Sequence, residues 1–451
     1  SKPKEYDNIP SAPGAVPILG HALKYRQDPS RFLVKTREKV GDIFQLNLAG
    51  KRMIVACGPS TQRSVANAPE SIMSARKAVA DVGFEEMLGS LNVYQGTDLH
   101  KGIIKGWTNS NESKDRVVVE YIKTVRSALL VETKCWENQQ IEFMALIRRV
   151  VLRAVIENCI GEFFLERWNF DFIEEFMKFQ DDLEDATAKS AVMPRTLALP
   201  LFLWPLRRRR LNLQRLISKR FEEALPHLSK QSLGFWLVSV KETHSLDDIA
   251  QLVVGLLFAA HKNPAIGSAQ SYLMLFEHAT PEQQQVCIDE SQALLSNPTI
   301  NLNIQESCPT LYRLCLETLR LTAHSIGGLR TSTKDFPIDN NVTIPKGGTV
   351  ALAHIPSSLN AEFWENSNTL DLNITTNRPY DDEYAFTTFS HGVHKCPGRQ
   401  FSMVMLPCTV AILLAEYRIN LPCKIPPLCF ERATLAQRAG PVNIFIQSLE
   451  E

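Results

Sequence analysis

"FSHGVHKCPGR", residues Phe389 to Arg399, holds two histidines, a lysine and one cysteine around two glycines. Zinc is the first metal that such a segment suggests, because it prefers thiolate and imidazole ligands. A structural zinc site needs four ligands, usually in two close pairs, and the other cysteines of the chain form no C-x-x-C pair. Zinc is therefore the weaker interpretation, and Cys396 is expected to bind something else.

The surroundings of Cys396 favour a thiolate that holds a soft metal. Pro397 follows it and opens a long apolar segment, and proline suits the first position of a helix. The N–H groups and dipole at a helix start stabilise an anion, so we expect the thiol to ionise more easily than a free one. Gly392 and Gly398 would let the backbone approach a flat ligand, and Phe389 can pack beside the sulfur.

Composition limits the remaining possibilities. The chain has 451 residues, is 44% hydrophobic, and carries 49 basic and 49 acidic residues, so nucleic acid is not an expected partner. Ten scattered cysteines suggest reduced thiols in a cytosol-facing protein. No linker or repeat divides the chain. We expect a proline-rich lead-in over residues 1–24 and one domain over residues 25–451.

Hydrophobic periodicity predicts a mainly α-helical chain with minor β structure. Residues 41–58 read as two strands around an Ala-Gly-Lys turn, and short strand-like pieces with a C-terminal hairpin follow Arg330. Five further segments repeat apolar residues at helical spacing. These are residues 137–161, 168–186, 246–278, 309–323 and 398–417.

Membrane contact is suggested by one segment only. The sequence contains no apolar run of about 18 residues, the length that would predict a membrane-spanning helix. Residues 197–210 set an apolar run against four arginines. They form either a buried loop before a solvated basic helix, or a surface that enters a bilayer interface, where tryptophan and arginine are favourable.

The segment around the cysteine also matches a known signature. Phe389, Gly392, Cys396 and Gly398 fit F-x-x-G-x-x-x-C-x-G, the haem-binding signature of the cytochrome P450 family, which the chain resembles over essentially its whole length. The resemblance implies the cytochrome P450 fold, a helical haem-binding domain with small β-sheets. It also implies haem b as cofactor and Cys396 as the axial ligand of its iron.

A second motif supports the resemblance. The segment ETLR, Glu317 to Arg320, matches the E-x-x-R pair of the family at the expected position. Alone, this spacing usually marks a surface pair worth tenths of a kcal/mol. In the family the pair is buried and joined by an arginine from a later loop, for which Arg378 is the best match. The expected role of this triad is to lock the fold around the haem.

The propionates of a haem need cationic or donor partners, and the resemblance implies three. Arg330 lies ten residues after Arg320, and His394 stands at an arginine position of the signature. Lys101 aligns with the arginine of a W-x-x-x-R motif whose tryptophan is here Thr97. Simple solvation is the alternative for His394 and Lys101.

Residues 258–267, FAAHKNPAIG, should cross the distal face of the haem by the same resemblance. Most monooxygenases of the family carry A-G-x-(D/E)-T there, whereas Lys262 and Asn263 replace the acid and the hydroxyl. Pro264 lacks an N–H, which frees the carbonyl of Ala260 to hold water or oxygen. Asn263 can donate and accept hydrogen bonds but cannot pass a proton as a hydroxyl does. We predict catalytic roles for Ala260, Lys262 and Asn263, with Lys262 facing solvent or another helix as the alternative.

The implied activity is that of a haem-thiolate monooxygenase, an oxidoreductase acting with dioxygen on a sterol, terpenoid or fatty-acid derivative. The chain has no nicotinamide or flavin fingerprint, so electrons from NADPH should arrive through a separate reductase docking near Lys395 and Arg399. One alternative is an isomerase or dehydratase that rearranges a lipid hydroperoxide or endoperoxide without dioxygen, as Asn263 suggests. A non-enzymatic haem sensor or carrier is the other.

The lead-in resembles the proline-rich hinge that follows the membrane anchor of microsomal members. We therefore expect a monomer of lipid metabolism at the cytosolic face of the endoplasmic reticulum membrane, with an anchor outside the present sequence. By the same resemblance, residues 74–96 should cover the pocket.

Overall fold

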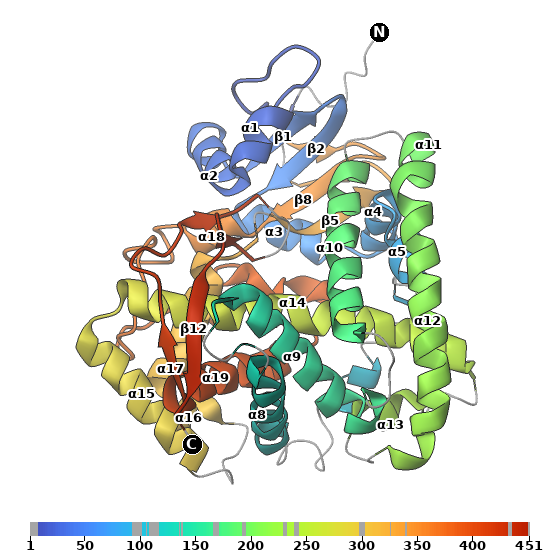
Figure 1. Ribbon diagram of the computed structural model, residues 1–451. Helices are drawn as coiled ribbons and strands as arrows, with labels where there is room; N and C mark the ends of the chain where they lie inside the picture. The colour runs from blue at the N-terminus through green and yellow to red at the C-terminus, as the bar shows by residue number, and fades with distance from the viewer. Residues whose placement is uncertain are drawn as a thin grey trace.

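The computed structural model of the chain is mainly helical, with a main sheet at one end and smaller sheets elsewhere, among them the one that contains β12 (Figure 1). It describes residues 8–92, 102–104, 106–107, 117–134, 136, 139–165, 171–191, 195–228, 232–238, 243–296, 303–324, 326–338, 341–431 and 435–449. The predicted fold class, mainly α with minor β, is confirmed.

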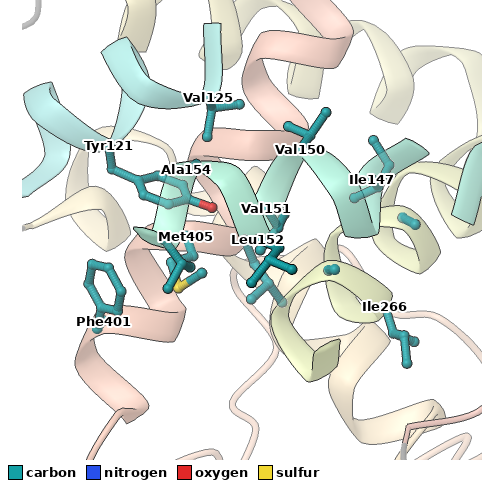
Figure 2. Close-up of a cluster of buried hydrophobic side chains, with 14 of the residues drawn as sticks. Tyr121, Val125, Ile147, Val150, Val151, Leu152, Ala154, Ile266, Phe401 and Met405 are labelled. Atoms are coloured by element: carbon teal, nitrogen blue, oxygen red, sulfur yellow. The ribbon is translucent and has the colours of Figure 1, made fainter. Parts of the chain in front are cut away.

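Four helices make the centre of the core: α8 (Val117–Lys134), α9 (Phe143–Cys159), α14 (Leu246–His278) and α19 (Arg399–Glu416). Figure 2 shows how they meet, with Tyr121 of α8, Val151 of α9, Ile266 of α14 and Met405 of α19 buried in one apolar cluster. This packing carries α14 through the middle of the molecule and sets α19 beside it.

Helix α14 begins at a capping box, in which Ser245 Oγ accepts from the N–H of Asp248 and the Asp248 carboxylate accepts from the N–H of Ser245. By length and composition, α14 and α19 could each cross a membrane, a possibility that the sequence prediction overlooked. However, 67% of the most apolar window of each helix is buried inside the protein, as in a core helix.

The main sheet joins the N-terminal part of the chain to residues 326–353. Its strand order is β1-β2-β8-β5-β3, with β2 and β8 parallel and the other neighbours antiparallel. The predicted hairpin over residues 41–58 is confirmed, because β1 and β2 are connected through Ala49 and Gly50. The strands are β1 (Ile43–Leu48), β2 (Lys51–Ala56), β3 (Met73–Ser74), β5 (Ile326–Ser332) and β8 (Thr349–Ala353).

Residues 8–24, the described part of the predicted lead-in, lie against the edge of β1. Gln45 donates its N–H to the carbonyl of Pro10 at 2.8 Å and accepts from the N–H of Ala12 at 3.0 Å. His21 is buried and bonds the carbonyl of Ala12 at 2.8 Å. This part of the lead-in therefore extends the sheet.

The smaller sheets correct one prediction. Strands β6 (Phe336–Pro337) and β7 (Thr343–Ile344) pair locally. The predicted C-terminal hairpin is wrong, because β11 (Gln437–Arg438) pairs with β10 (Leu428–Cys429), whereas β12 (Asn443–Ser448) lies between β4 (Ile141–Glu142) and β9 (Tyr417–Asn420). For strands this short, the packing of the surrounding helices decides which strands pair, and the spacing in the sequence does not.

The five predicted helical segments are confirmed as α9, α10, α14, α17 and α19. Helices α10 and α12 stand next to each other at one side of the molecule (Figure 1). The remaining helices are α1 (Ala22–Gln27), α2 (Pro29–Val40), α3 (Pro59–Ala66), α4 (Ala75–Asp81), α5 (Phe84–Leu88), α10 (Phe172–Ala191), α11 (Arg195–Ala198), α12 (Trp204–Ala224), α13 (Leu233–Val238), α15 (Pro281–Ser296), α16 (Ile304–Ser307), α17 (Pro309–Leu321) and α18 (Ile355–Ser358), with a π-turn at Leu199–Leu203.

Candidate active site

The cysteine loop is closed by its own backbone. The N–H of Cys396 donates to the carbonyl of Phe389 at 2.8 Å. Helix α19 begins at Arg399 with Gly398 as its N-cap, so Pro397 lies before the helix and not at its first position as predicted. The loop therefore presents the cysteine side chain just ahead of the helix start.

Cys396 opens into a cavity of about 410 Å³. The cysteine loop forms one wall, α14 another, and β5 with the segment before it a third. From the region predicted to cover the pocket, Ala75 and Val79 of α4 contribute. The other lining residues are Ala259, Asn263, Pro264, Leu319, His324, Gly327, Gly328, Leu329, Arg330, His354, Thr388, Phe389, Ser390, His394, Ser402, Leu406 and Leu435.

The protonation of the thiol differs from the prediction. Burial raises the pKa of Cys396, and the N–H of Gly398, which donates to the sulfur, lowers it by less. The side chain is exposed to the cavity, but the walls around it remove bulk water. The expected ease of ionisation is therefore wrong for the protein alone. A bound cation would reverse this balance, because an opposite charge favours the thiolate.

The two signature glycines have different reasons for being glycine. Gly392 has a φ of +67°, and a Cβ there would lie 2.7 Å from the carbonyl oxygen of Ala66, so it is required by close packing on α3. A Cβ on Gly398 would meet only the sulfur of Cys396, at 3.8 Å. Protein packing does not require Gly398, whereas a flat ligand approaching the sulfur would.

Glu317 and Arg320 form a fully buried pair, both with 0% of the side chain exposed. Arg320 donates from Nε and Nη2 to the carboxylate of Glu317, at 2.9 and 2.8 Å. Its remaining donors reach the carbonyls of Ser358, Ser367 and Thr369. Such a pair is stable in a core only when its hydrogen bonds are made, and here they are.

Arg378 joins this cluster by a different route from the predicted one. It bonds the carboxylate of Asp371 at 3.0 and 2.9 Å, not that of Glu317. The N–H of Asp371 donates to Glu317 at 3.1 Å, and Tyr380 Oη donates to Glu317 at 2.7 Å. Glu317 therefore receives neutral donors where a second arginine was predicted, and Asp371 holds the charge of Arg378.

The predicted propionate partners have different surroundings. Arg330 lines the cavity and is only 4% exposed, and its Nη2 has no hydrogen-bond partner among the described residues. His394 also lines the cavity and bonds Glu70 at 3.2 Å. Lys101 lies outside the described residues, and its role stays a prediction.

Helix α14 separates the predicted catalytic residues. Asn263 lines the cavity, and its amide oxygen accepts from the N–H of Leu435 at 3.5 Å. Lys262 does not line it, because its Nζ is held by Asp181 at 2.7 Å and Glu184 at 2.5 Å, both on α10. The prediction of a catalytic Lys262 is corrected in this respect, and the alternative, contact with another helix, agrees with the structure.

The residues next to Lys262 and Asn263 on α14 also differ in whether they line the cavity. Ala259, rather than Ala260, is the small residue that lines the cavity. Pro264 lies inside an uninterrupted α14 and also lines the cavity. Helix positions 259 and 263 are one turn apart and share a face, whereas Lys262 lies next to Asn263 in sequence and turns toward α10.

The sequence predictions missed His324 and His354, which line the cavity beside Arg330. His324 ends the segment after α17, and His354 follows β8. Only the pairing of β5 with β8 brings them together, so no local pattern points to them.

The residues at the cavity fit a haem. Cys396 supplies a soft ligand, Gly398 leaves room beside the sulfur, and Nη2 of Arg330, which has no partner among the described residues, suits a buried carboxylate. Among the described residues no group of three or more His, Cys, Asp or Glu side chains is arranged to hold a metal ion. A cofactor that brings its own metal therefore suits the site better than a bare ion.

This combination, a helical body with a cysteine facing a cavity beneath a long central helix, defines the haem-thiolate class of protein. The family model for Cytochrome P450 matches residues 10–444, and the chain belongs to this family. It is a cytochrome P450 monooxygenase, an oxidoreductase with a haem iron cofactor. Membership implies electrons supplied by a reductase and a lipophilic substrate.

Similar curated proteins include lanosterol 14-alpha demethylases. The protein of Rattus norvegicus is 24% identical over 433 residues, which cover 90% of this chain and 81% of the relative. That of Eremothecium gossypii is 24% identical over 455 residues, covering 92% and 84%. A "Probable lanosterol 14-alpha demethylase" of Acanthamoeba polyphaga mimivirus is 21% identical over 434 residues, covering 92% and 59%.

Proposed function

We propose that this protein oxidises a sterol-like lipophilic molecule with dioxygen, with Cys396 as the ligand of the haem iron. The observation that carries the proposal is the position of Cys396 on the wall of a cavity whose opposite side is the α14 segment with Ala259 and Asn263. The relatives named above favour a sterol over the terpenoid and fatty-acid alternatives.

Five residues would hold the cofactor. Cys396 would bind the iron, with Phe389 and Gly398 beside it, and Arg330 and His394 would bind carboxylates of the haem. When bound, the haem iron with its thiolate ligand supplies the chemistry that activates dioxygen. Lys101 is proposed as a further partner on the family resemblance alone.

On the opposite wall, Asn263 would orient a polar group through its amide, which can both donate and accept. It cannot pass a proton, and Lys262 is held away by two carboxylates, so neither replaces the usual acid and hydroxyl. Pro264 has no N–H to offer the carbonyl of Ala260, which leaves that oxygen as a site for an ordered water. Ala260 itself does not line the cavity, so a water held at its carbonyl would have to reach the cavity past Ala259 and Asn263, and we propose this water as the proton donor.

Electrons would come from NADPH through a separate reductase. Lys395 is exposed near the cysteine and pairs with Glu383 at 3.3 Å, and Arg399 lies 3.6 Å from Asp381. Exposed pairs of this kind are weak, so both cations can exchange their partners for an acidic surface. This agrees with the basic docking face suggested by the sequence.

We further propose that a membrane surface supplies the substrate. Ile18 is 91% exposed, Leu201 58% and Trp204 50%. The turn between β1 and β2 contacts both parts of the chain, because Ala49 donates its N–H to the carbonyl of Leu19 and Lys51 Nζ donates to that of Ser190, at the end of the helix that precedes residues 197–204. Exposure of the segment at 197–204 favours the interfacial alternative over a buried loop.

A monomer at the cytosolic face of the endoplasmic reticulum would fit this surface. Sedimentation with phosphatidylcholine vesicles should be weakened by Leu201→Glu. The matched control is Leu216→Glu, which changes a 40% exposed leucine of α12 about four turns away. Equal binding by both variants would remove this part of the proposal.

The reaction is tested with ¹⁸O₂, NADPH and a reductase on a panel of sterols, terpenoids and fatty acids. The proposal predicts label in a sterol product and no turnover without the reductase. Conversion of a lipid hydroperoxide or endoperoxide without reductase, at an unchanged rate under nitrogen, would favour the isomerase alternative instead.

A further inference from the structure

Three histidines, the buried His354 and His391 and the half-buried His324, form a row at one side of the cavity, and we call them the histidine row. The ring centroids of His324 and His354 are 5.8 Å apart, and those of His354 and His391 are 5.7 Å apart. His354 is 1% exposed and His391 0%. His324 and His354 line the cavity itself.

Five of the six ring nitrogens of the row lack partners among the described residues. Both ring nitrogens of His354 and of His391, and Nδ1 of His324, are buried without a hydrogen bond. Buried polar atoms are nearly always satisfied, so five such atoms in one row require an explanation. A neutral imidazole offers one donor and one acceptor, so His354 and His391 each have a donor to give, and His324 has one in the tautomer that carries its proton on Nδ1.

The backbone is shaped around His354. Strand β5 pairs Ile326 with Ala353 and Gly328 with Leu352, which leaves Gly327 as an extra residue in a bulge. A Cβ on Gly327 would lie 1.5 Å from Cε1 of His354, so only glycine leaves room for this ring. The bulge therefore holds the imidazole at the cavity wall, although the ring makes no hydrogen bond there.

The neighbouring charges indicate what the row would bind. Arg330 lines the same wall with Nη2 unpartnered. The acidic groups nearby are engaged elsewhere, because Glu70 bonds His394 and Glu383 bonds Lys395. Burial lowers the pKa of His324 and of His391 to about 4, and burial with the neighbouring rings lowers the pKa of His354, so the row is neutral until an anion approaches.

We propose that His354 and His324, together with Arg330, form a donor wall that binds the carboxylate of a ligand in the cavity. The inference rests on the proposed function, since that function places a ligand there. Two sources share the chemistry: a propionate of the haem, in addition to the bonds assigned to Arg330 and His394, or the acid group of a substrate. His391 packs behind His354 and is a positioning residue.

The first arm of the test follows haem. In the holoprotein, transfer of haem to excess apomyoglobin should be about tenfold faster in His354→Phe than in the wild type, the effect of losing one hydrogen bond to a charged group. Protein reconstituted with the dimethyl ester of haem should show no such difference. His354→Gln, which keeps a donor, should restore slow transfer.

The second arm follows an acidic ligand by spectral titration of the holoprotein. If the substrate is the source, palmitic acid should bind about tenfold more weakly to His354→Phe, while methyl palmitate binds unchanged. His227→Phe is the matched control, since His227 stacks on Phe163 with a centroid distance of 4.7 Å and does not line the cavity. If His354→Phe does not fold, His324→Phe takes its place in both arms.

The donor wall is supported if His354→Phe differs from the wild type in either arm and the difference is absent with the corresponding ester. The arm that shows the difference identifies the source of the carboxylate. The proposal is overturned if folded His354→Phe matches the wild type in haem transfer and in preference for acid over ester. In that case, thiolate ligation of haem in the wild type would still support the proposed function. Failure of the donor wall can therefore be told apart from failure of the proposed function.

Discussion

Two buried polar regions of this molecule contrast in how completely their hydrogen bonds are made. In the cluster of Glu317 and Arg320, every donor of the guanidinium and both carboxylate oxygens have partners. At the wall with Arg330 and His354, buried nitrogens have none among the described residues. The difference separates a region that holds the fold together from one that faces a ligand.

Glu317→Ala should have the largest effect, because it leaves Arg320 as an unpaired buried cation. Removing one partner of a buried pair costs about 3 to 5 kcal/mol, a large part of the stability of a typical domain. Arg378 keeps Asp371, so the loss falls on one arginine, not two. We expect little folded protein and little bound haem on expression. The exposed Glu222→Ala should behave as the wild type, and equal yields from both variants would contradict the assignment.

The two signature glycines offer a smaller and sharper contrast. Gly392→Ala should lower the free energy of unfolding by about 1 to 3 kcal/mol, because its Cβ meets the backbone of α3 and its φ is positive. Gly398→Ala should leave the unfolding of the haem-free protein nearly unchanged and weaken haem binding. Urea denaturation and haem titration of both variants measure this, and an equal effect on both properties would count against the assignment.

Lys262→Met should lower stability and leave the haem spectrum unchanged, because Lys262 has its hydrogen-bond partners within the protein and does not line the cavity. Loss of its bonds to Asp181 and Glu184 should cost about 1 to 2 kcal/mol, since Asp181 is partly exposed and can be solvated. Asn263→Ala is the control on the cavity side and should change ligand-binding spectra with little loss of stability. A changed Soret band in Lys262→Met alone would contradict the placement.

Asp371→Asn should have the smallest effect, about 1 kcal/mol at neutral pH. Burial raises the pKa of Asp371, but the N–H of Asn373 and the guanidinium of Arg378 outweigh it, and the net pKa lies below the usual value. A depressed pKa stabilises the fold above the unfolded value of about 3.9 and loses this contribution as pH falls through the folded pKa. The difference between variant and wild type should therefore be constant from pH 5 to 8 and shrink below pH 4. A difference that grows in acid would refute this.

Several parts of the fold and of the site can be predicted from local sequence. The helix with ETLR, the cysteine loop and the first hairpin carry their own signals in apolar spacing, glycines and turn residues. The partner of Arg378 did not follow, because nothing in the loop sequence distinguishes Asp371 from other surface acids. The choice depends on how residues 371–378 fold back against α17.

The cavity wall is less predictable, for a physical reason. His324 and His354 meet only through the register of β5 on β8, and Lys262 meets α10 only through helix packing. The pKa of Cys396 depends on the desolvation that the whole body provides, which outweighs the local N–H. Tertiary packing decides such features, and a single sequence does not encode them in a readable pattern.

The central claim is that Cys396 is the thiolate ligand of a haem iron, and the spectrum of the reduced protein with carbon monoxide tests it most directly. The account predicts the red-shifted Soret band of thiolate ligation in the wild type and in Cys423→Ser, which changes an exposed thiol elsewhere. It predicts loss of that band in Cys396→Ser. Persistence of the band in Cys396→Ser, or its absence from the wild type with haem bound, would contradict the account.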